Sequence, residues 1–167
     1  MVKREIRCAV ITLSDKGSKG EREDRSGKIL INLIEKEIGK VEFYEVIPDE
    51  KELIIQQLLR FCEKDKVDII FTTGGTGVSP RDVTPDATKV VIEKEIPGFG
   101  ELMRVESLKK TPTAILSRAT AGVRGETLII NLPGSPKAVE ECFNAIKGAI
   151  PHAVEKIKGS EVECARE

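Results

Sequence analysis

Short apolar blocks separated by polar segments run along the chain, and the period of each block predicts the element that it forms. Arg7–Leu13 and Val67–Thr73 are nearly continuous apolar runs, which is typical of parallel strands covered on both faces. Val41–Ile47 alternates apolar and polar residues and predicts a further strand. Thr113–Val123 and Thr127–Leu132 predict two more strands, which a short turn joins into an antiparallel hairpin.

Apolar residues at helical spacing lie between these strands. Ser26–Ile38 and Gly98–Lys110 are each predicted to form a helix with one apolar face. Thr84 is the expected N-cap of another helix, which has a proline in its first turn. The last helical region begins at Ser135, and Pro151 is expected to break it.

The segment after the alternating strand predicts the start of one more helix. Asp49 is a good N-cap, and Glu52 three residues later completes the pattern of a capping box. Leu53, Leu58 and Phe61 then follow at helical spacing.

Alternating strands and helices predict an α/β fold. We expect a three-layer sandwich in which a mostly parallel sheet has helices on both faces and an antiparallel hairpin at one edge. In such folds ligands bind at the carboxyl ends of the strands. The segments at those ends are Ser14-Asp15, Pro48-Asp49, Gly74–Asp82 and Asn131–Ser135. The unusual segments of the chain are therefore predicted to meet at one edge of the sheet.

Length and composition narrow the classes of protein. The 167 residues predict a single domain spanning 1–167, and the net charge of −1 with 4% aromatic residues disfavours a nucleic-acid binder. No apolar run approaches the ~20 residues of a membrane helix, and no signal-peptide core follows Met1, so a cytoplasmic protein is expected. Abundant Lys and Glu with scarce Asn and Gln suggest a thermophilic source.

Cysteine and histidine offer little chemistry. The cysteines Cys8, Cys62, Cys142 and Cys164 form no CxxC pair and are interpreted as buried thiols. His152 is the one histidine of the chain, which excludes zinc sites built on several histidines. Catalysis is therefore expected from carboxylates, Lys or Arg, hydroxyls, backbone NH groups or a bound ion.

A glycine-rich loop follows the second apolar strand directly. Its residues Gly74, Gly75, Thr76 and Gly77 lack the Gly-Lys-Ser/Thr of a Walker A loop, and Pro80 stands where a Rossmann motif needs its third glycine. Such a loop can still present backbone NH groups to phosphate. The alternative is a tight turn in which glycine supplies only a positive φ.

A second strand-to-helix junction has the same two interpretations. Gly134 and Ser135 precede a helix whose first NH groups could bind an anion, and Lys137 adds a positive charge. The alternative is an ordinary helix start in which Ser135 is only the N-cap. We expect phosphate or sulfate to bind here.

Acidic side chains stand at adjacent strand ends. Asp49 and Asp82 are candidates for Mg²⁺, which proteins hold with one or two carboxylates together with substrate phosphates. Helix capping by Asp49, and a turn or an Arg81 partnership for Asp82, are the structural alternatives. Asp15 is a weaker candidate because Ser-Asp is also a common turn pair.

Long motifs carry a resemblance to a known family. The chain from Thr73-Gly74-Gly75-Thr76-Gly77 through Arg81-Asp82-Val83-Thr84-Pro85-Asp86-Ala87-Thr88 resembles the signature of the molybdopterin-binding domain family. Further matching segments are Ser14-Asp15, Ile47–Glu50, Pro97–Arg104, Ala114–Arg118 and Asn131–Ala138. Within the family, Pro97–Gly100 and Asn131–Pro136 are most similar to the molybdopterin adenylyltransferases.

The resemblance implies a fold, a reaction and roles for residues. It implies a three-layer α/β trimer that converts molybdopterin and MgATP into adenylyl-molybdopterin and pyrophosphate, and a molybdenum insertase as a partner. Asp49 and Asp82 correspond to the aspartates needed for adenylyl transfer, which would bind Mg²⁺ directly or through water. The implied nucleotide-binding residues are Ser14, Asp15, Gly74, Gly75, Thr76 and Gly77. The implied molybdopterin-binding residues are Ser107, Ser117, Asn131, Gly134 and Ser135.

Two other functions stay open at this point. The chain could be a pterin-binding or carrier protein with little turnover, of the kind named MoaB within the same family. It could also be an ordinary nucleotide-binding protein, although the missing Walker and Rossmann motifs argue against that.

Overall fold

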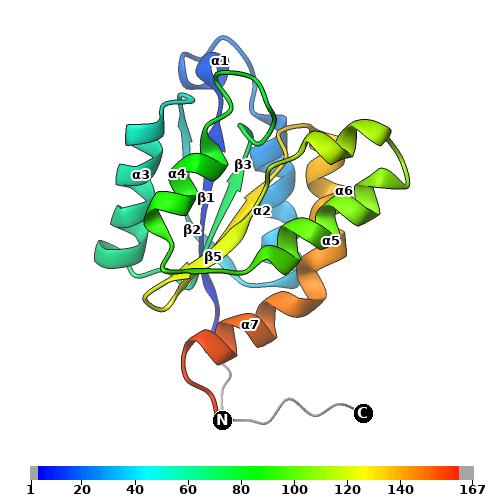
Figure 1. Ribbon diagram of the computed structural model, residues 1–167. Helices are drawn as coiled ribbons and strands as arrows, with labels where there is room; N and C mark the ends of the chain where they lie inside the picture. Colours follow the sequence, from blue (N-terminus) through cyan, green and yellow to red (C-terminus); the bar gives the residue numbers. More distant parts are fainter. Residues whose placement is uncertain (1–3, 162–167) are drawn as a thin grey trace.

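A mixed sheet of six strands in the order β2-β1-β3-β6-β5-β4 forms the centre of the molecule (Figure 1). The computed structural model describes residues 4–161. The strands are β1 (Arg7–Leu13), β2 (Lys40–Ile47), β3 (Ile69–Thr73), β4 (Lys94–Glu95), β5 (Ala121–Arg124) and β6 (Thr127–Leu132). The first four in this order are parallel, whereas β5 is antiparallel to β6 and β4. The predicted α/β fold and its hairpin are confirmed; the sequence pattern did not indicate the short edge strand β4.

Helices cover both faces of the sheet, which gives the predicted three layers (Figure 1). The α-helices are α1 (Asp15–Ser18), α2 (Arg25–Glu37), α3 (Lys51–Leu59), α4 (Thr84–Val91), α5 (Pro97–Leu108), α6 (Pro136–Ile146) and α7 (Ile150–Ile157). A π-turn (Arg60–Lys64) and 3₁₀ turns (Pro112–Leu116 and Lys147–Ala149) complete the helical elements of residues 4–161. α3 and α4 lie against one face, and α2, α5, α6 and α7 contribute to the core on the other.

The core explains the continuous apolar runs. Successive side chains of a strand point to opposite faces. Val10 therefore packs with α2 and α6, while its neighbour Ile11 packs with α3 and α4. Ile129 and Ile130 divide in the same way on β6. Since both faces are covered, every position of these strands has to be apolar or internally hydrogen-bonded.

The predicted strand Thr113–Val123 is wrong over its first half. Pro112–Leu116 forms a 3₁₀ turn, and pairing begins only at Ala121. Pro112 has a fixed φ and no NH to donate, which suits the start of a turn better than a strand. The amide of Arg118 donates to the Thr76 carbonyl oxygen at 2.8 Å, so this segment runs beside the glycine loop instead of along β6.

Two predicted helix boundaries also differ. Pro151 lies in the first turn of α7 and starts that helix, while the break falls at Lys147–Ala149. A proline is tolerated in a first turn because its missing NH would have no intrahelical partner there. Thr84 is the first residue of α4, not its N-cap, because its hydroxyl donates instead to the Gly74 carbonyl oxygen at 2.9 Å.

The cysteines within the described residues are free thiols. Cys8 and Cys142 are buried and Cys62 is half-buried, whereas Cys164 lies outside the described residues. Burial raises the pKa of Cys62 to about 11 and that of Cys8 to about 12, so both thiols stay protonated and unreactive at neutral pH. Within residues 4–161, no helix is long and apolar enough to cross a membrane.

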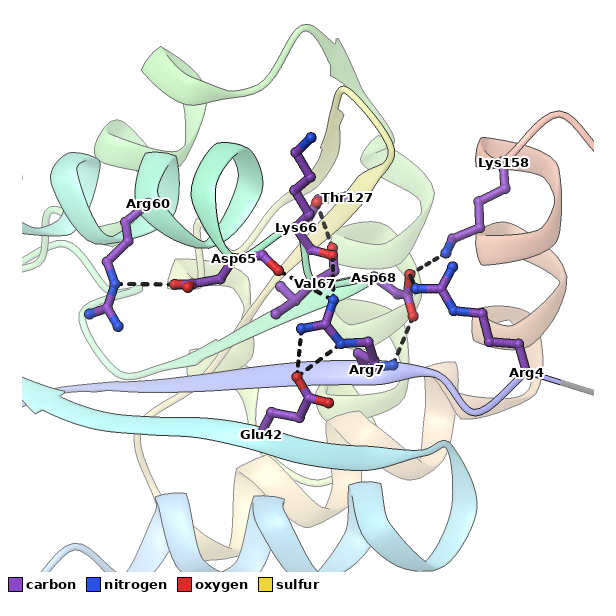
Figure 2. A network of polar contacts seen from close by, with 10 residues as sticks. All are labelled: Arg4, Arg7, Glu42, Arg60, Asp65, Lys66, Val67, Asp68, Thr127 and Lys158. Atoms are coloured by element: carbon purple, nitrogen blue, oxygen red, sulfur yellow. Dashed lines mark hydrogen bonds and ion pairs between the residues drawn. The ribbon is translucent and has the colours of Figure 1, made fainter.

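Asp68 joins both ends of the described chain to the amino end of the sheet (Figure 2). Its side chain accepts from the Arg7 amide at 2.8 Å and from the Lys158 ammonium after α7, and lies 3.9 Å from the Arg4 guanidinium. Asp68 is only 3% exposed. Burial alone would raise the pKa of this carboxyl, but the Arg7 amide and Lys158 outweigh it and lower the pKa.

We expect Asp68→Asn to lower the free energy of unfolding by about 1–3 kcal/mol at pH 7, because Lys158 loses a charged partner. A carboxyl with a lowered folded-state pKa stabilises the protein above its unfolded-state pKa, and this stabilisation disappears as the pH falls through the folded-state pKa. The difference between variant and wild type in urea titrations should therefore shrink below about pH 4. A difference that stays constant with pH would contradict this account of Asp68.

Candidate active site

A cavity of about 780 Å³ opens at the carboxyl ends of the parallel strands. The strand-end segments that were predicted to meet do so here, with α1 and the loop after β3 at the same end of the sheet (Figure 1). Its lining includes Ser14, Asp49, Gly74, Gly75, Asp82, Gly134 and Ser135 from the predicted set. The parallel register of β1, β3 and β6 produces this convergence, because all three strands end at one edge.

Asp15 and Asp49 are held together by reciprocal hydrogen bonds. The Asp15 amide donates to Asp49 Oδ2 at 3.1 Å, and the Asp49 amide donates to Asp15 Oδ1 at 3.0 Å. The prediction that Asp49 caps a helix is therefore wrong: Glu50 is the N-cap of α3, and no side chain caps that helix end. The Asp49 carboxylate lines the cavity, because it contacts the neighbouring strand end at Asp15 and does not cap its own helix.

The charges around Asp49 oppose its ionisation. Burial is the main cause that raises the pKa of the Asp49 carboxyl, and the charges of Asp15 and Asp82 add to it. Arg81 lowers the pKa of Asp15, to which its guanidinium donates at 2.8 and 2.9 Å. Arg81 thus pairs with Asp15 and not with Asp82, the partner considered from the sequence. The lining of the cavity carries four carboxylates, from Glu23, Asp24, Asp49 and Asp82, and two guanidinium groups, from Arg22 and Arg25.

The glycine loop leaves room for two carboxylates. Gly75 has φ +66°, and a Cβ there would lie 2.3 Å from the Thr84 hydroxyl and 3.1 Å from Asp49 Oδ1. A Cβ at Gly77 would lie 2.8 Å from Asp82 Oδ2. The positive φ of Gly75 agrees with the turn interpretation, and the missing Cβ atoms at Gly75 and Gly77 also leave space beside Asp49 and Asp82. Phosphate binding by the NH groups of the loop stays a prediction.

The Gly134–Ser135 junction closes the other side of the cavity. Ser135 is the N-cap of α6, and its Oγ accepts from the Ala138 amide at 3.1 Å. The Ser26 hydroxyl in the first turn of α2 donates to the Gly134 carbonyl oxygen at 2.5 Å. A Cβ at Gly134 would lie 3.1 Å from Gly74 Cα, so the two glycine segments are in close backbone contact.

Several predicted site residues lie away from this cavity. Asn131 is fully buried in β6 and donates to the hydroxyls of Thr72 and Thr88 at 3.0 and 2.9 Å. Ser107 lies on α5, with its Oγ 3.5 Å from Cys142 Sγ. Ser117 lines a separate cavity of about 270 Å³. Thr76 is 6% exposed and is not in the lining of the cavity.

The sequence interpretation missed Asp24. Asp24 lines the cavity and caps α2 by accepting from the Gly27 amide at 2.9 Å. The hydroxyls of Thr12 and Tyr44 also donate to its carboxylate. An Asp directly before a helical apolar pattern is a recognisable N-cap signal. That signal could have identified Asp24.

Two carboxylates of the cavity are the groups that could hold a metal ion. Within residues 4–161, no group of three or more His, Cys, Asp or Glu side chains is arranged to hold a metal ion. Asp49 and Asp82 line the same cavity and offer carboxylate oxygens, the ligand type that Mg²⁺ prefers. The negative charges of Asp15 and Asp82 help to raise the pKa of Asp49, and a divalent cation bound beside these carboxylates would reduce the repulsion between them.

Known proteins share both the sequence and the fold. The family described as "Probable molybdopterin binding domain" matches residues 9–152. The molybdopterin adenylyltransferase of Helicobacter pylori strain J99 is 49% identical over 160 residues, covering 95% of this chain and 91% of that protein. The chain therefore belongs to the molybdopterin-binding domain family.

Solved structures agree with this assignment. The molybdopterin biosynthesis enzyme MoaB of Thermus thermophilus superposes with a TM-score of 0.87 at 44% identity, covering 92% of this chain and 97% of that one. The tungsten cofactor synthesizing protein MoaB of Pyrococcus furiosus gives a TM-score of 0.86 at 36% identity, covering 94% of this chain and 99% of that one.

Proposed function

We propose that the protein is a molybdopterin adenylyltransferase of molybdenum cofactor biosynthesis, with ATP and molybdopterin as substrates. The observation that carries this proposal is the convergence of Asp49, Asp82 and the glycine loop on one cavity in a chain of this family. The 49% identical relative named molybdopterin adenylyltransferase supports the same activity.

The chemistry needs positioning more than proton transfer. The terminal phosphate of molybdopterin attacks the α-phosphorus of ATP, a new phosphorus–oxygen bond forms, and the bond to the β-phosphate bridging oxygen breaks, so that pyrophosphate leaves. A phosphate monoester is largely ionised at neutral pH, so no general base is required. That fits a cavity whose described lining includes no histidine.

Each wall of the cavity has a role in this proposal. Asp49 and Asp82 would hold Mg²⁺ directly or through water together with phosphate oxygens, and the ion supplies neutralisation of the phosphate charge. Ser14, Gly74 and Gly75 line the nucleotide side, whereas Asp15, Thr76 and Gly77 are not in the lining of the cavity. Gly134 and Ser135, at the start of α6, form the side that takes the pterin phosphate, because the positive end of the helix dipole favours anions, although Pro136 has no NH and the Ala138 amide already donates to Ser135 Oγ.

The direct test is pyrophosphate release from ATP. We expect release that requires both molybdopterin and Mg²⁺, with adenylyl-molybdopterin formed in equal amount and detected by mass spectrometry. Release without molybdopterin would indicate an unrelated nucleotide hydrolase. Tight molybdopterin binding with no release under any metal would favour the carrier function, a candidate that the two structural relatives named MoaB keep open.

We also expect the protein to be a homotrimer. Large apolar side chains are exposed on α5 and on the 3₁₀ turn that packs against it: Leu102 (42% exposed), Val105 (55%), Ile115 (69%) and Leu116 (50%). Clustered exposed apolar residues are typical of an interaction surface. Light scattering should give three times 18.4 kDa, and Val105→Glu should reduce this to the monomer mass with the fold intact. A wild-type monomer would overturn the expectation.

An insertase that receives the product, and a cytoplasmic location, complete the proposal.

A further inference from the structure

Arg118 reaches from the segment before β5 to the glycine loop. Its Nε donates to the Gly77 carbonyl oxygen at 2.8 Å, and its Nη2 donates to the Asp82 carbonyl oxygen at 2.5 Å. The Arg118 amide donates to the Thr76 carbonyl oxygen at 2.8 Å. One residue thus contacts the backbone of the loop at three points between Thr76 and Asp82.

Asp86 fixes the plane of this guanidinium. Both carboxylate oxygens of Asp86 accept from Arg118, at 3.0 Å each, in a bidentate pair. Such fork-to-fork geometry restricts the orientation as well as the distance of the two groups. Asp86 lies in the first turn of α4, so the loop is held against a helix through Arg118.

The loop segment that Arg118 holds has one other side-chain anchor, the ion pair of Arg81 with Asp15. Val78, Ser79 and Pro80 are exposed, and the loop backbone there is closed by an Asp82 amide to Ser79 carbonyl bond of 3.0 Å. The Asp82 carboxylate accepts in turn from the Ser79 amide at 3.0 Å. The position of that carboxylate in the cavity therefore depends on the backbone of Gly77–Asp82, two of whose carbonyls Arg118 binds.

We propose that Arg118 is a positioning residue that sets where the Asp82 carboxylate stands in the cavity. This proposal rests on the proposed function, because the position of the Asp82 carboxylate affects turnover only if Asp82 takes part in the proposed reaction. Arg118 lines the separate cavity behind the loop and is not in the lining of the active-site cavity, so it acts through Asp82 and not on the substrate. Lysine cannot replace it, since a single ammonium cannot reach both carbonyls and Asp86 in one plane.

A double-mutant cycle tests this role. Arg118→Lys should lower the turnover number by about 10- to 100-fold, the size expected when a reacting group is misplaced by about 1 Å. It should also raise the Mg²⁺ concentration for half-maximal rate, with the KM for molybdopterin unchanged. In the Asp82→Asn background, Arg118→Lys should cost almost nothing more, because the group it positions is already absent.

Arg104→Lys is the matched control. Arg104 lines the same rear cavity and donates to the carbonyl oxygens of Ser117 and Ala119 at 3.3 and 3.0 Å, without a contact to the glycine loop. We expect its Mg²⁺ dependence and turnover to match the wild type. Asp86→Asn leaves the carbonyl contacts of Arg118 in place and should show a smaller loss than Arg118→Lys.

Hydrogen exchange separates this proposal from the proposed function. Exchange at the Ser79 and Asp82 amides should speed up in Arg118→Lys, while exchange in β1 and β3 stays at the wild-type rate. If wild type releases no pyrophosphate, the proposed function fails, and exchange alone then decides whether Arg118 orders the loop. If wild type turns over, additive losses in the cycle or unchanged loop exchange would overturn the role of Arg118.

Discussion

Asp49→Asn is expected to reduce adenylylation by about 10²–10³-fold, the loss that follows removal of a key electrostatic contact from such a site. The substitution keeps the size of the side chain and removes the negative charge that the proposed Mg²⁺ site needs. In the wild type the Asp15 amide donates to Asp49 Oδ2 at 3.1 Å, and the side-chain oxygen of the asparagine can accept the same hydrogen bond. Molybdopterin binding should survive, because its proposed contacts come from Gly134 and Ser135.

Although Asp49→Asn should lower the rate, we expect it to raise the stability of the folded protein at neutral pH. The pKa of Asp49 is raised by burial and by the neighbouring charges of Asp15 and Asp82, so the folded state binds this proton more tightly than the unfolded chain does. Ionisation of Asp49 therefore costs stability, and the cost appears as the pH rises above the unfolded-state pKa of about 4. Asp49→Asn should have a higher melting temperature than wild type at pH 7 and the same one near pH 3.

Asp82→Asn, which removes the other proposed Mg²⁺-binding carboxylate, should be compared with Asp49→Asn in rate and in Mg²⁺ dependence. A similar fall in rate for both variants, with Mg²⁺ dependence altered in each, would support the paired carboxylates. Near-normal turnover in Asp49→Asn would reduce Asp49 to the structural bonds it makes with Asp15. Near-normal turnover in Asp82→Asn would remove the basis for the pair and for the role of Arg118.

The fold could be predicted because its signals are local and repeated. The apolar run Arg7–Leu13 is β1 itself, and the period of Ser26–Ile38 locates α2 to within one residue at each end. Strand ends that follow such runs converge by topology, which is why Asp49, Gly75, Asp82 and Ser135 were found together from the sequence. No contact between particular side chains was needed for that inference.

What the sequence could not reveal are contacts across long separations. Asp49 looked like a helix cap because Glu52 completes a capping box, and only the meeting with Asp15, from another strand end, overrides that local choice. Arg118 was predicted to be part of a strand, although it binds Gly77 and Asp82 far back along the chain. Asn131 matched the family motif, but its side chain is fully buried between the sheet and α4.

Gly75→Ala should abolish most of the adenylylation activity, because the added methyl group introduces backbone strain and a steric clash without changing any charge. The φ of +66° costs an alanine about 1–3 kcal/mol of strain, and its Cβ would lie 2.3 Å from the Thr84 hydroxyl. Thr84 then has to give up its bond to the Gly74 carbonyl oxygen, and the Asp49 carboxylate, 3.1 Å from the new methyl group, is displaced from the loop. We expect a loss of about 10²-fold in adenylylation, as for a misplaced reacting group.

Gly125→Ala separates the strain from the clash. Gly125 has φ +55° in the turn between β5 and β6, and a Cβ there would meet nothing within 4 Å. Gly125→Ala should therefore lose only the stability that the φ strain costs, whereas Gly75→Ala should lose more in thermal melts because it also clashes with Thr84, and only Gly75→Ala should lose pyrophosphate release. Equal loss of activity in the two would mean that turnover follows global stability, and full activity in Gly75→Ala would mean that the space above the loop is not where the phosphates lie. In the proposed reaction, Gly75 contributes the space beside the Asp49 carboxylate, and the pair of variants tests that contribution separately from the stability of the fold.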